Sequence, residues 1–472
     1  MSISFGSQPL LLAVVSEVLP RKYRTMAQAS SNFTGVTGGI IGVIMGGALV
    51  RHGNAENYRI YFYVLAAFFA AAAIGCALCY NPPLRELQKS LTTAEKLRRL
   101  DWIGYALFIP GLILFCIALS WSRNPYQWSN AHVLATFVIS IVLILGFLVY
   151  EWRFTTDGVL NHGLFRTRNF PLSLLLIFCE GLAFWACNNY LAFEVSVITG
   201  ADLLIAGLHL VLGFAFGMLG ALSIGWISSR WKVLKIPTVL GFLLLLAFNI
   251  GMATLQPSTP FGAYWGLVPL AGLGLGIILP SVIVIAQLST PPELISITSG
   301  LVTAIRSVGG AVGLAINTAL FNGALATNIP AKVAAATIPL GLPPTSLGPL
   351  IGALTSENQS ALAHIPGVTP EVIGAAAGAI KDAYSIGFRY AWIVACCFSA
   401  LALFGKFLRF GKTCRRLFPG LTHSPASFFV SDPHSEFTKH IDAPAEEDLV
   451  ELQARIEAVH EIYETPDKLA SE

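Results

Sequence analysis

The sequence predicts an all-α, polytopic membrane protein with about eleven transmembrane helices. Of its 472 residues, 55% are hydrophobic and only 12% are charged, whereas roughly a quarter of the residues in a soluble domain are charged. The mean hydropathy of +0.68 is correspondingly high. The apolar residues are also gathered into long segments, close to the roughly 20 residues that a helix needs to cross the hydrocarbon core of a bilayer.

Taken in order along the chain, eleven segments meet this length requirement. They lie at residues 3–19, 28–50, 60–80, 102–121, 131–151, 170–197, 204–227, 236–255, 262–286, 297–323 and 386–408. The net charge of +3 is too small to indicate a partner such as nucleic acid. The cysteines lack metal-ligand spacing, and the spans contain no nucleophile motif or phosphate loop, so neither a metal site nor an enzyme is expected.

The basic residues between these spans predict the orientation of the chain. Alternate connections, together with residues 406–416 at the end of the last span, hold 19 Lys and Arg residues, and the other connections hold five. Basic residues are retained on the cytoplasmic side of a membrane protein. We therefore expect the C-terminus in the cytoplasm and the N-terminus outside.

Two segments outside the spans stand out. The longest connection, 324–384, is expected to be an extracellular loop, and Asn358 in it fits a glycosylation acceptor. Residues 411–472 are expected to form a cytoplasmic tail. Near its end, Leu449, Leu452, Ile456, Val459 and Ile462 form one helical stripe, which fits a helix that docks on the bundle or one that binds a partner.

Two spans share runs of glycine. Gly38, Gly42 and Gly46 recur every four residues in the first of them, beside Gly47 and Leu49. The second contains Gly309, Gly310 and Gly313, which indicates an internal repeat of the kind found in secondary transporters. Small residues allow membrane helices to approach closely. Helix packing without any transport role explains the spacing equally well.

A family resemblance extends this interpretation. Gly38, Gly42, Gly46, Gly47 and Leu49 match the pattern G-x3-G-P-x2-G-G-x-L of proton-coupled drug antiporters in the major facilitator superfamily, with Val43 in place of the proline. Further segments resemble the 14-span fungal drug:proton antiporters, which include the trichothecene efflux pump family. These segments are SEVLPRKYR (Ser16–Arg24), RRLDWIGYALF (Arg98–Phe108), ALSWSRNPYQW (Ala118–Trp128), NNYLAFEVSVITG (Asn188–Gly200) and AQLSTPPELISITSGLVTAIRSVGG (Ala286–Gly310).

The resemblance implies a plasma-membrane pump of two helical bundles that exports toxins, drugs or secondary metabolites. Its energy source would be the proton gradient, with no cofactor. The resemblance also implies that three helices of the family are missing from the front. The chain would then consist of an N-terminal bundle remnant (1–80), a loop with two linker helices (81–169), a six-helix C-terminal bundle (170–410) and the tail (411–472). The alternatives are a siderophore transporter and a transport-inactive protein that associates with a full-length partner.

Ionisable and polar side chains within the spans mark the candidate site, because such residues are costly in a bilayer. Glu180 lies ten residues into its span, about 15 Å deep at 1.5 Å per residue, and is the leading candidate for proton coupling. Asn188 follows at helical spacing, and Arg306 offers a counter-charge. Asn189 and Glu194 complete the proposed cavity from nearer the outer end. For Glu180, a protonated structural acid is the alternative, and for Arg306 a structural ion pair.

Overall fold

The structure is a computed structural model of the whole chain. It describes Leu12 and residues 24–417, apart from breaks at 51–54, 80–94, 96–97, 99, 122–125, 156–157, 159, 161, 168, 232, 291–293, 356–361 and 363. Nearly all of the expected span 3–19, Asn358 and the tail from residue 418 onward lie outside these described residues.

The described part of the chain contains ten helices that are long and apolar enough to cross a membrane, which confirms the predicted fold class. They are α2 (Arg24–Val50), α3 (Tyr58–Cys79), α6 (Trp102–Trp121), α7 (Ala131–Arg153), α8 (Asn169–Thr199), α9 (Leu203–Trp231), α10 (Lys235–Thr254), α11 (Gly262–Leu288), α12 (Ile295–Thr337) and α15 (Pro370–Leu417). The short 3-10 helices η2 (Ala55–Asn57) and η3 (His162–Arg166) precede α3 and α8.

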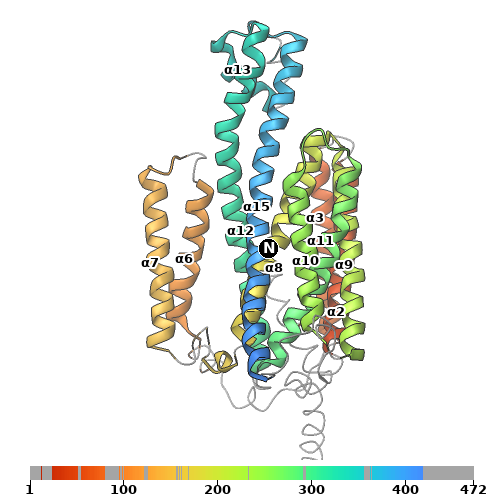
Figure 1. Cartoon of the computed structure of the whole chain (residues 1–472), viewed down its shortest axis with the longest axis vertical. Helices are drawn as coiled ribbons and strands as arrows, with labels where there is room; N and C mark the ends of the chain where they lie inside the picture. The colour runs from red at the N-terminus through yellow and green to blue at the C-terminus, as the bar shows by residue number, and fades with distance from the viewer. Residues whose placement is uncertain are drawn as a thin grey trace, which may run out of the picture.

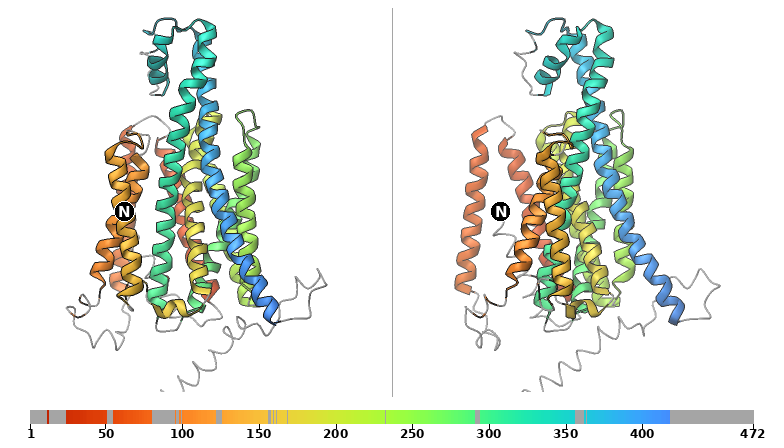
Figure 2. Two further views of the ribbon diagram at one scale, coloured as in Figure 1. Left: turned by 60° about the vertical axis from the view of Figure 1, so that its left-hand side comes forward. Right: turned by 90° about the vertical axis from the view of Figure 1, so that its left-hand side faces the viewer.

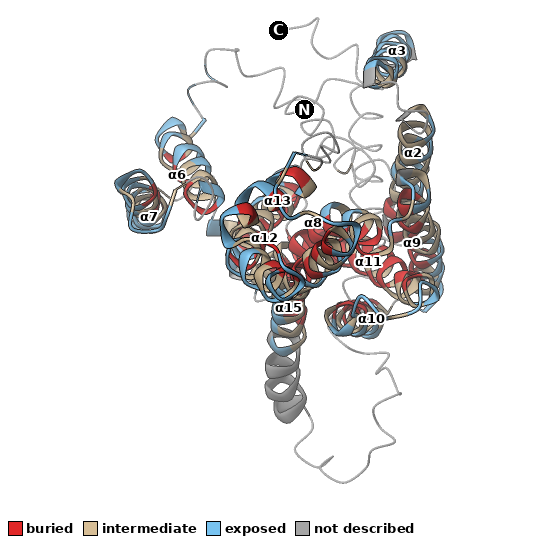
Figure 3. Cartoon of the chain, turned by 90° about the horizontal axis from the view of Figure 1, so that it is seen from above, coloured by how far each residue is buried: buried red, intermediate tan, exposed pale blue. Residues whose placement is uncertain are grey.

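The helices run side by side, with α8, α12 and α15 between the pair α6 and α7 and the group formed by α2, α3, α9, α10 and α11 (Figure 1). One hydrophobic core joins α8, α10, α11, α12 and α15, and its members include Ile177, Phe248, Val302 and Trp392. Viewed along the bundle, the buried residues concentrate where these helices face one another, and α9 then α2 extend the row outward (Figure 3). The outer surfaces expose apolar side chains, which suits contact with lipid.

The helices α6 and α7 form a pair of their own beside the bundle (Figure 2). Aromatic contacts join the two helices, with the ring centroids of Phe108 and Phe147 4.9 Å apart. Gly111 of α6 lies against Ile144 of α7, so closely that an added Cβ would come within 3.1 Å of that side chain. In the sequence, the pair lies between α3 and α8.

The connection 324–384 is mostly helical, unlike the loop that the sequence predicts. The helix α12 runs for 43 residues and α15 for 48, so both continue past the other helices as a hairpin (Figures 1 and 2). The helices η5 (Ile338–Leu340), η6 (Pro344–Ser346) and α13 (Leu347–Thr355) close its tip. Two causes explain the helices: alanine has the highest helix propensity, and Val333, Leu350 and Val372 bury a small core of their own.

The glycines of the second repeat lie at the contact between α8 and α12. A Cβ added to Gly309 would overlap the carbonyl of Phe178, and one added to Gly313 would overlap the side chain of Leu182. From the other side, a Cβ at Gly181 would overlap the carbonyl of Arg306. Added to Gly310, a Cβ would overlap the Trp185 ring. These glycines bring the two backbones into direct contact, as small residues do in membrane helices.

The glycine row of α2 has different surroundings. Cβ atoms added to Gly39 and Gly47 would contact Phe214 and Leu204 of α9. Among the described residues, no helix backbone covers the row Gly38, Gly42 and Gly46: its only neighbour within 4 Å of an added Cβ is the Tyr61 ring of α3. Leu49 lines the same open groove. The close approach expected from this row is therefore made by the glycines beside it.

We predict that Gly309→Ala destabilises the protein, because the new methyl group must push α8 away from α12. Overpacking of this kind costs about 1–3 kcal/mol. Gly300→Ala in the same helix is the matched control, since an added Cβ there meets nothing within 4 Å. This control should leave stability unchanged or raise it by up to about 1 kcal/mol through helix propensity. Unfolding midpoints of the purified variants in detergent measure both effects, and equal midpoints would contradict the prediction.

Candidate functional site

The Glu180 carboxylate and the Arg306 guanidinium form an ion pair between α8 and α12. Arg306 Nε donates to Glu180 Oε2 at 2.6 Å, and Arg306 Nη2 donates to Glu180 Oε1 at 2.9 Å. The Glu180 side chain is 1% exposed and that of Arg306 17%. Such a fork-shaped, charge-assisted pair is among the strongest hydrogen-bonded arrangements in proteins. The helix contact at Gly181 places the two groups within reach.

The Phe184 ring completes the surroundings of the guanidinium. Arg306 Cζ lies 4.4 Å from the centroid of this ring, one helical turn beyond Glu180. A guanidinium over an aromatic face is attracted by the ring quadrupole, by about 2 kcal/mol when the pair is desolvated. Arg306 is thus held by a carboxylate and by an aromatic ring, both supplied by α8.

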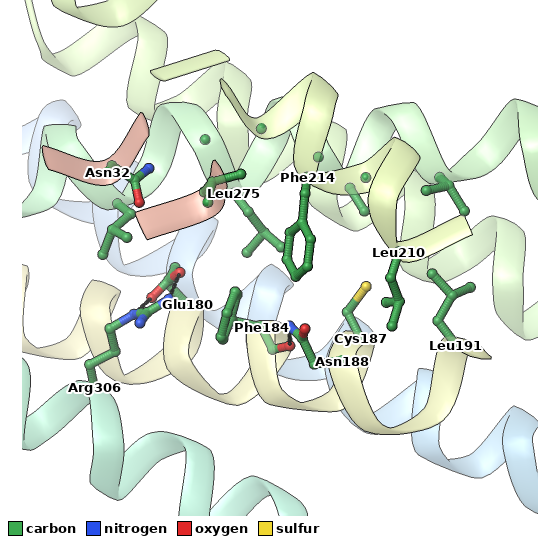
Figure 4. A pocket seen from close by; sticks show the side chains of 18 residues that line it. Asn32, Glu180, Phe184, Cys187, Asn188, Leu191, Leu210, Phe214, Leu275 and Arg306 are labelled. Atoms are coloured by element: carbon green, nitrogen blue, oxygen red, sulfur yellow. Dashed lines mark hydrogen bonds and ion pairs between the residues drawn. The ribbon is translucent and has the colours of Figure 1, made fainter. Parts of the chain in front are cut away.

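The pair lies in the wall of a cavity between α2 and the helices of the C-terminal bundle (Figure 4). The residues that line it are Asn32, Val36, Glu180, Phe184, Cys187, Asn188, Leu191, Leu210, Gly213, Phe214, Gly217, Val268, Ala271, Gly272, Leu275, Gly276, Leu279 and Arg306. Its volume is about 60 Å³. One water needs about 10–15 Å³ of such space, so the cavity has room for a few waters, whereas drug-sized ligands occupy about 300–1,000 Å³.

Of the predicted site residues, the structure brings Glu180, Asn188 and Arg306 to this cavity. The Asn188 side chain donates to the Phe184 carbonyl at 2.8 Å. Asn189 is exposed, and its amide donates to the Trp185 carbonyl of its own helix at 2.8 Å. It does not line the cavity, because one residue along a helix turns a side chain by about 100°.

Glu194 also lies away from the cavity and is 4% exposed. Trp392 Nε1 donates to Glu194 Oε2 at 2.6 Å, and the Tyr264 hydroxyl donates to Glu194 Oε1 at 3.5 Å. These donors stand on α15 and α11. No local pattern could have identified them, because they are 198 and 70 residues away in sequence.

Several lining residues were missed by the sequence analysis. Asn32 carried a usable signal, since it is a polar residue within an apolar span. Phe214, Leu210 and Leu275 carried none, because an apolar side chain in a membrane helix can face lipid, a neighbouring helix or a cavity. Their position depends on how α9 and α11 are rotated in the bundle.

The fold and this site define a polytopic membrane protein with a partly polar cavity inside its helical bundle. The sequence profile of the Major Facilitator Superfamily matches residues 3–314. The chain belongs to this superfamily and is a membrane transporter, not an enzyme.

Curated relatives in fungi are similar at low identity. The MFS-type efflux pump MFS1 of Trichophyton rubrum is 26% identical over 388 residues, which cover 79% of this chain and 67% of the relative. The MFS-type transporter VdtG of Byssochlamys spectabilis is 25% identical, covering 79% and 64%. The MFS-type transporter olcL of Penicillium canescens is 26% identical, covering 84% and 64%. The matched part is thus about two thirds of the length of these relatives.

Among solved structures, the chain is similar to a bacterial homologue of the human lysosomal transporter Spinster, determined in an inward-facing, occupied conformation. The TM-score is 0.46 at 14% sequence identity. The similarity covers 88% of this chain and 74% of that one.

We predict that Glu180 and Arg306 are strongly coupled in stability. Arg306→Gln or Glu180→Gln alone leaves one buried polar or charged group without its partner, and breaking a buried ion pair costs about 3–5 kcal/mol. The double variant should therefore cost clearly less than the sum of the two single variants. Unfolding midpoints of the four proteins in detergent give the coupling.

The exposed pair Glu56–Arg59 is the matched control. Its N–O distance is 3.2 Å, with the side chains of Arg59 and Glu56 57% and 77% exposed. Solvent screening limits such pairs to about 0.2–1 kcal/mol. The same cycle of single and double variants is measured at Glu56 and Arg59. If the coupling free energy between Glu180 and Arg306 is no larger than that of this control, the buried pair adds no specific stability and the prediction is wrong.

Proposed function

We propose that this protein exports small apolar organic molecules in exchange for protons, with the Glu180–Arg306 pair as the proton-responsive element. The observation that carries the proposal is a buried, two-pronged ion pair in the wall of a mainly apolar cavity inside the helical bundle. Ionisable residues are rare inside bilayers and mark proton or substrate pathways. The printed descriptions of the fungal relatives as efflux pumps and transporters support the same class of activity.

Protonation of Glu180 is the chemical step in this proposal. A proton on the carboxyl removes its negative charge and thereby weakens the attraction to the Arg306 guanidinium. Water in the small cavity brings the proton to the carboxyl. Because Glu180 belongs to α8 and Arg306 to α12, weakening the pair loosens the contact between these two helices and shifts the balance between conformations of the bundle.

Substrate entry requires the cavity to enlarge. Its walls come from α2 on one side and from α8, α9, α11 and α12 on the other, so separation of α2 from the other helices widens it. Secondary transporters move one bundle against another around a central site in this way. The mainly apolar lining, with Phe184 and Phe214 among its side chains, suits a flat, uncharged molecule.

We also propose that the chain is a member of the 14-span drug:proton antiporter branch in the plasma membrane. The separate pair α6–α7, which lies between α3 and α8 in the sequence, supports this proposal, because the branch would have two linker helices at that point. The excess of Lys and Arg on one set of connections supports a cytoplasmic C-terminus.

The test is proton-driven uptake of the flat, uncharged aromatic dye Nile red into inside-out plasma-membrane vesicles that contain the protein. We predict that Glu180→Gln reduces uptake to the level of vesicles without the protein, because glutamine cannot exchange a proton. Glu371→Gln is the control, since Glu371 is an exposed acid at the start of α15, in the hairpin. Protein content of the vesicles is matched by immunoblot.

The outcomes separate clearly. Full proton-driven uptake by Glu180→Gln would refute the role of this carboxyl. Uptake only in right-side-out vesicles would reverse the proposed direction of transport. An absence of uptake by the wild-type chain in both orientations, at matched protein content, would contradict transport of this dye by the chain alone.

A further inference from the structure

Glu194 is a second carboxyl inside the membrane part of the bundle, and it is held quite differently from Glu180. Trp392 of α15 and Tyr264 of α11 donate to its two oxygens. The side chain therefore ties α8, α11 and α15 together. The tie lies near the end of α8 and the start of α11, which is the end of the bundle from which the α12–α15 hairpin projects (Figure 1).

Within the described residues, Glu194 has no cation as a partner. A carboxylate without one is costly at such a site, whereas a neutral carboxyl held by an indole N–H and a phenol O–H is not. The arrangement in the structure therefore fits a Glu194 that carries its proton. Glu180, with Arg306 beside it, is suited to the ionised form.

Arg389 is a cation close to this tie, and the described part of the chain gives it no ion pair. It lies on α15 within the membrane span Pro370–Phe404, three residues before Trp392. Residues three apart on a helix are neighbours, with about 5–6 Å between their Cβ atoms. The Nε of Arg389 is buried and has no hydrogen-bond partner in the described part of the chain. A buried, unpaired guanidinium donor is itself costly.

We propose that Glu194 and Arg389 form a second, switchable ion pair at the hairpin end of the bundle. With its proton, Glu194 is bound by Trp392 and Tyr264 as in this structure. On losing the proton to water at that end, Glu194 becomes a carboxylate, and the Arg389 side chain turns onto it. The exchange strengthens the contact between α8 and α15.

The other groups near this site have separate partners or no charge. Tyr190 of α8 lies 3.5 Å from the Thr318 hydroxyl of α12. His209 of α9 has its Nδ1 3.0 Å from the Ile205 carbonyl, and its ring makes an edge contact with Tyr264 of α11 and lies tilted against Trp265. The charged residues of α12 are Arg306, paired with Glu180, and Lys332, in the hairpin. The only charged residue of α10, Lys235, is at its opposite end.

The consequence reaches beyond the bundle, because α15 continues without a break from this site into the hairpin. A change in how α8 holds α15 at Glu194 also changes the position of the hairpin. The switch thus reports the proton concentration on the hairpin side of the membrane. The switch is separate from the Glu180–Arg306 pair, because that pair lines the cavity and Glu194 does not.

The test is a double-variant cycle of Glu194→Gln and Arg389→Gln in the full chain, followed by thermal unfolding in detergent at acidic and at alkaline pH. Glutamine keeps an acceptor for Trp392 and removes the titrating group. At alkaline pH we expect the two substitutions to be non-additive by about 2 °C or more in melting temperature. At acidic pH they should be additive, since the neutral carboxyl has no ion pair to lose.

Lys381→Gln, two turns earlier on α15, is the matched control and should be additive with Glu194→Gln at every pH. Additivity of Glu194→Gln and Arg389→Gln at both pH values would overturn the proposal, and equal coupling at both would show a permanent pair without a switch. The same cycle in a His209→Asn background should be unchanged. Loss of the pH dependence there would assign the switch to His209 and overturn the role of Glu194.

A second measurement does not require the Arg389 variant to fold. Infrared difference spectra of the wild-type protein between acidic and alkaline pH should show a buried carboxyl C=O band that disappears on deprotonation. Glu194→Gln should remove this band, and persistence of the band would overturn the proposal. Neither experiment measures transport, so their failure is distinguishable from failure of the proposed export function.

Discussion

The close contact between α8 and α12 is the constraint on which the site depends. A charge inside a bilayer must be compensated by a partner that is also inside. For Glu180 this partner is Arg306, and their side chains meet because Gly181, Gly309 and Gly313 remove the side-chain volume between the two backbones. The glycines therefore act on the ion pair through geometry. Larger residues at these positions would separate α8 from α12 and so move Glu180 away from Arg306.

Similar glycine sequences have different roles in this molecule. The row in α12 is filled by α8, so that backbone lies on backbone, while the row Gly38, Gly42 and Gly46 in α2 opens onto a groove beside Tyr61. Glycine spacing identifies a face of a helix that can be approached closely. It does not identify the helix that approaches it, because the partner is chosen by the packing of the whole bundle.

The two buried carboxyls of α8, Glu180 and Glu194, have different kinds of partner. Glu180 faces a guanidinium and an aromatic ring at a cavity wall, and Glu194 faces an indole and a phenol within the packed core. They are four helical turns apart, and their local sequences do not distinguish a group suited to charge from one suited to neutrality. The difference comes from what α12, α11 and α15 place opposite each of them.

Much of the fold could be predicted from the sequence because partition between water and lipid depends on local composition. Ten of the predicted spans correspond to helices, and α6 begins and ends at the expected residues. The hairpin could not be predicted in this way. The length rule applies only to segments that cross the bilayer, and the helices of the hairpin depend on alanine propensity and on a small core that includes Val333, Leu350 and Val372.

By itself, then, the sequence determined that the chain is a bundle of membrane helices, where most of those helices lie, and that Glu180 and Arg306 are polar groups in apolar surroundings. Only the tertiary structure decided that these two side chains meet, that Asn189 turns away from the cavity, and that Trp392 and Tyr264 hold Glu194. The physical reason is that the free energy of moving a segment from water into lipid is a sum over the residues of that segment. The partner of a side chain depends instead on the rotation and depth of another helix, which are set by residues far away in sequence.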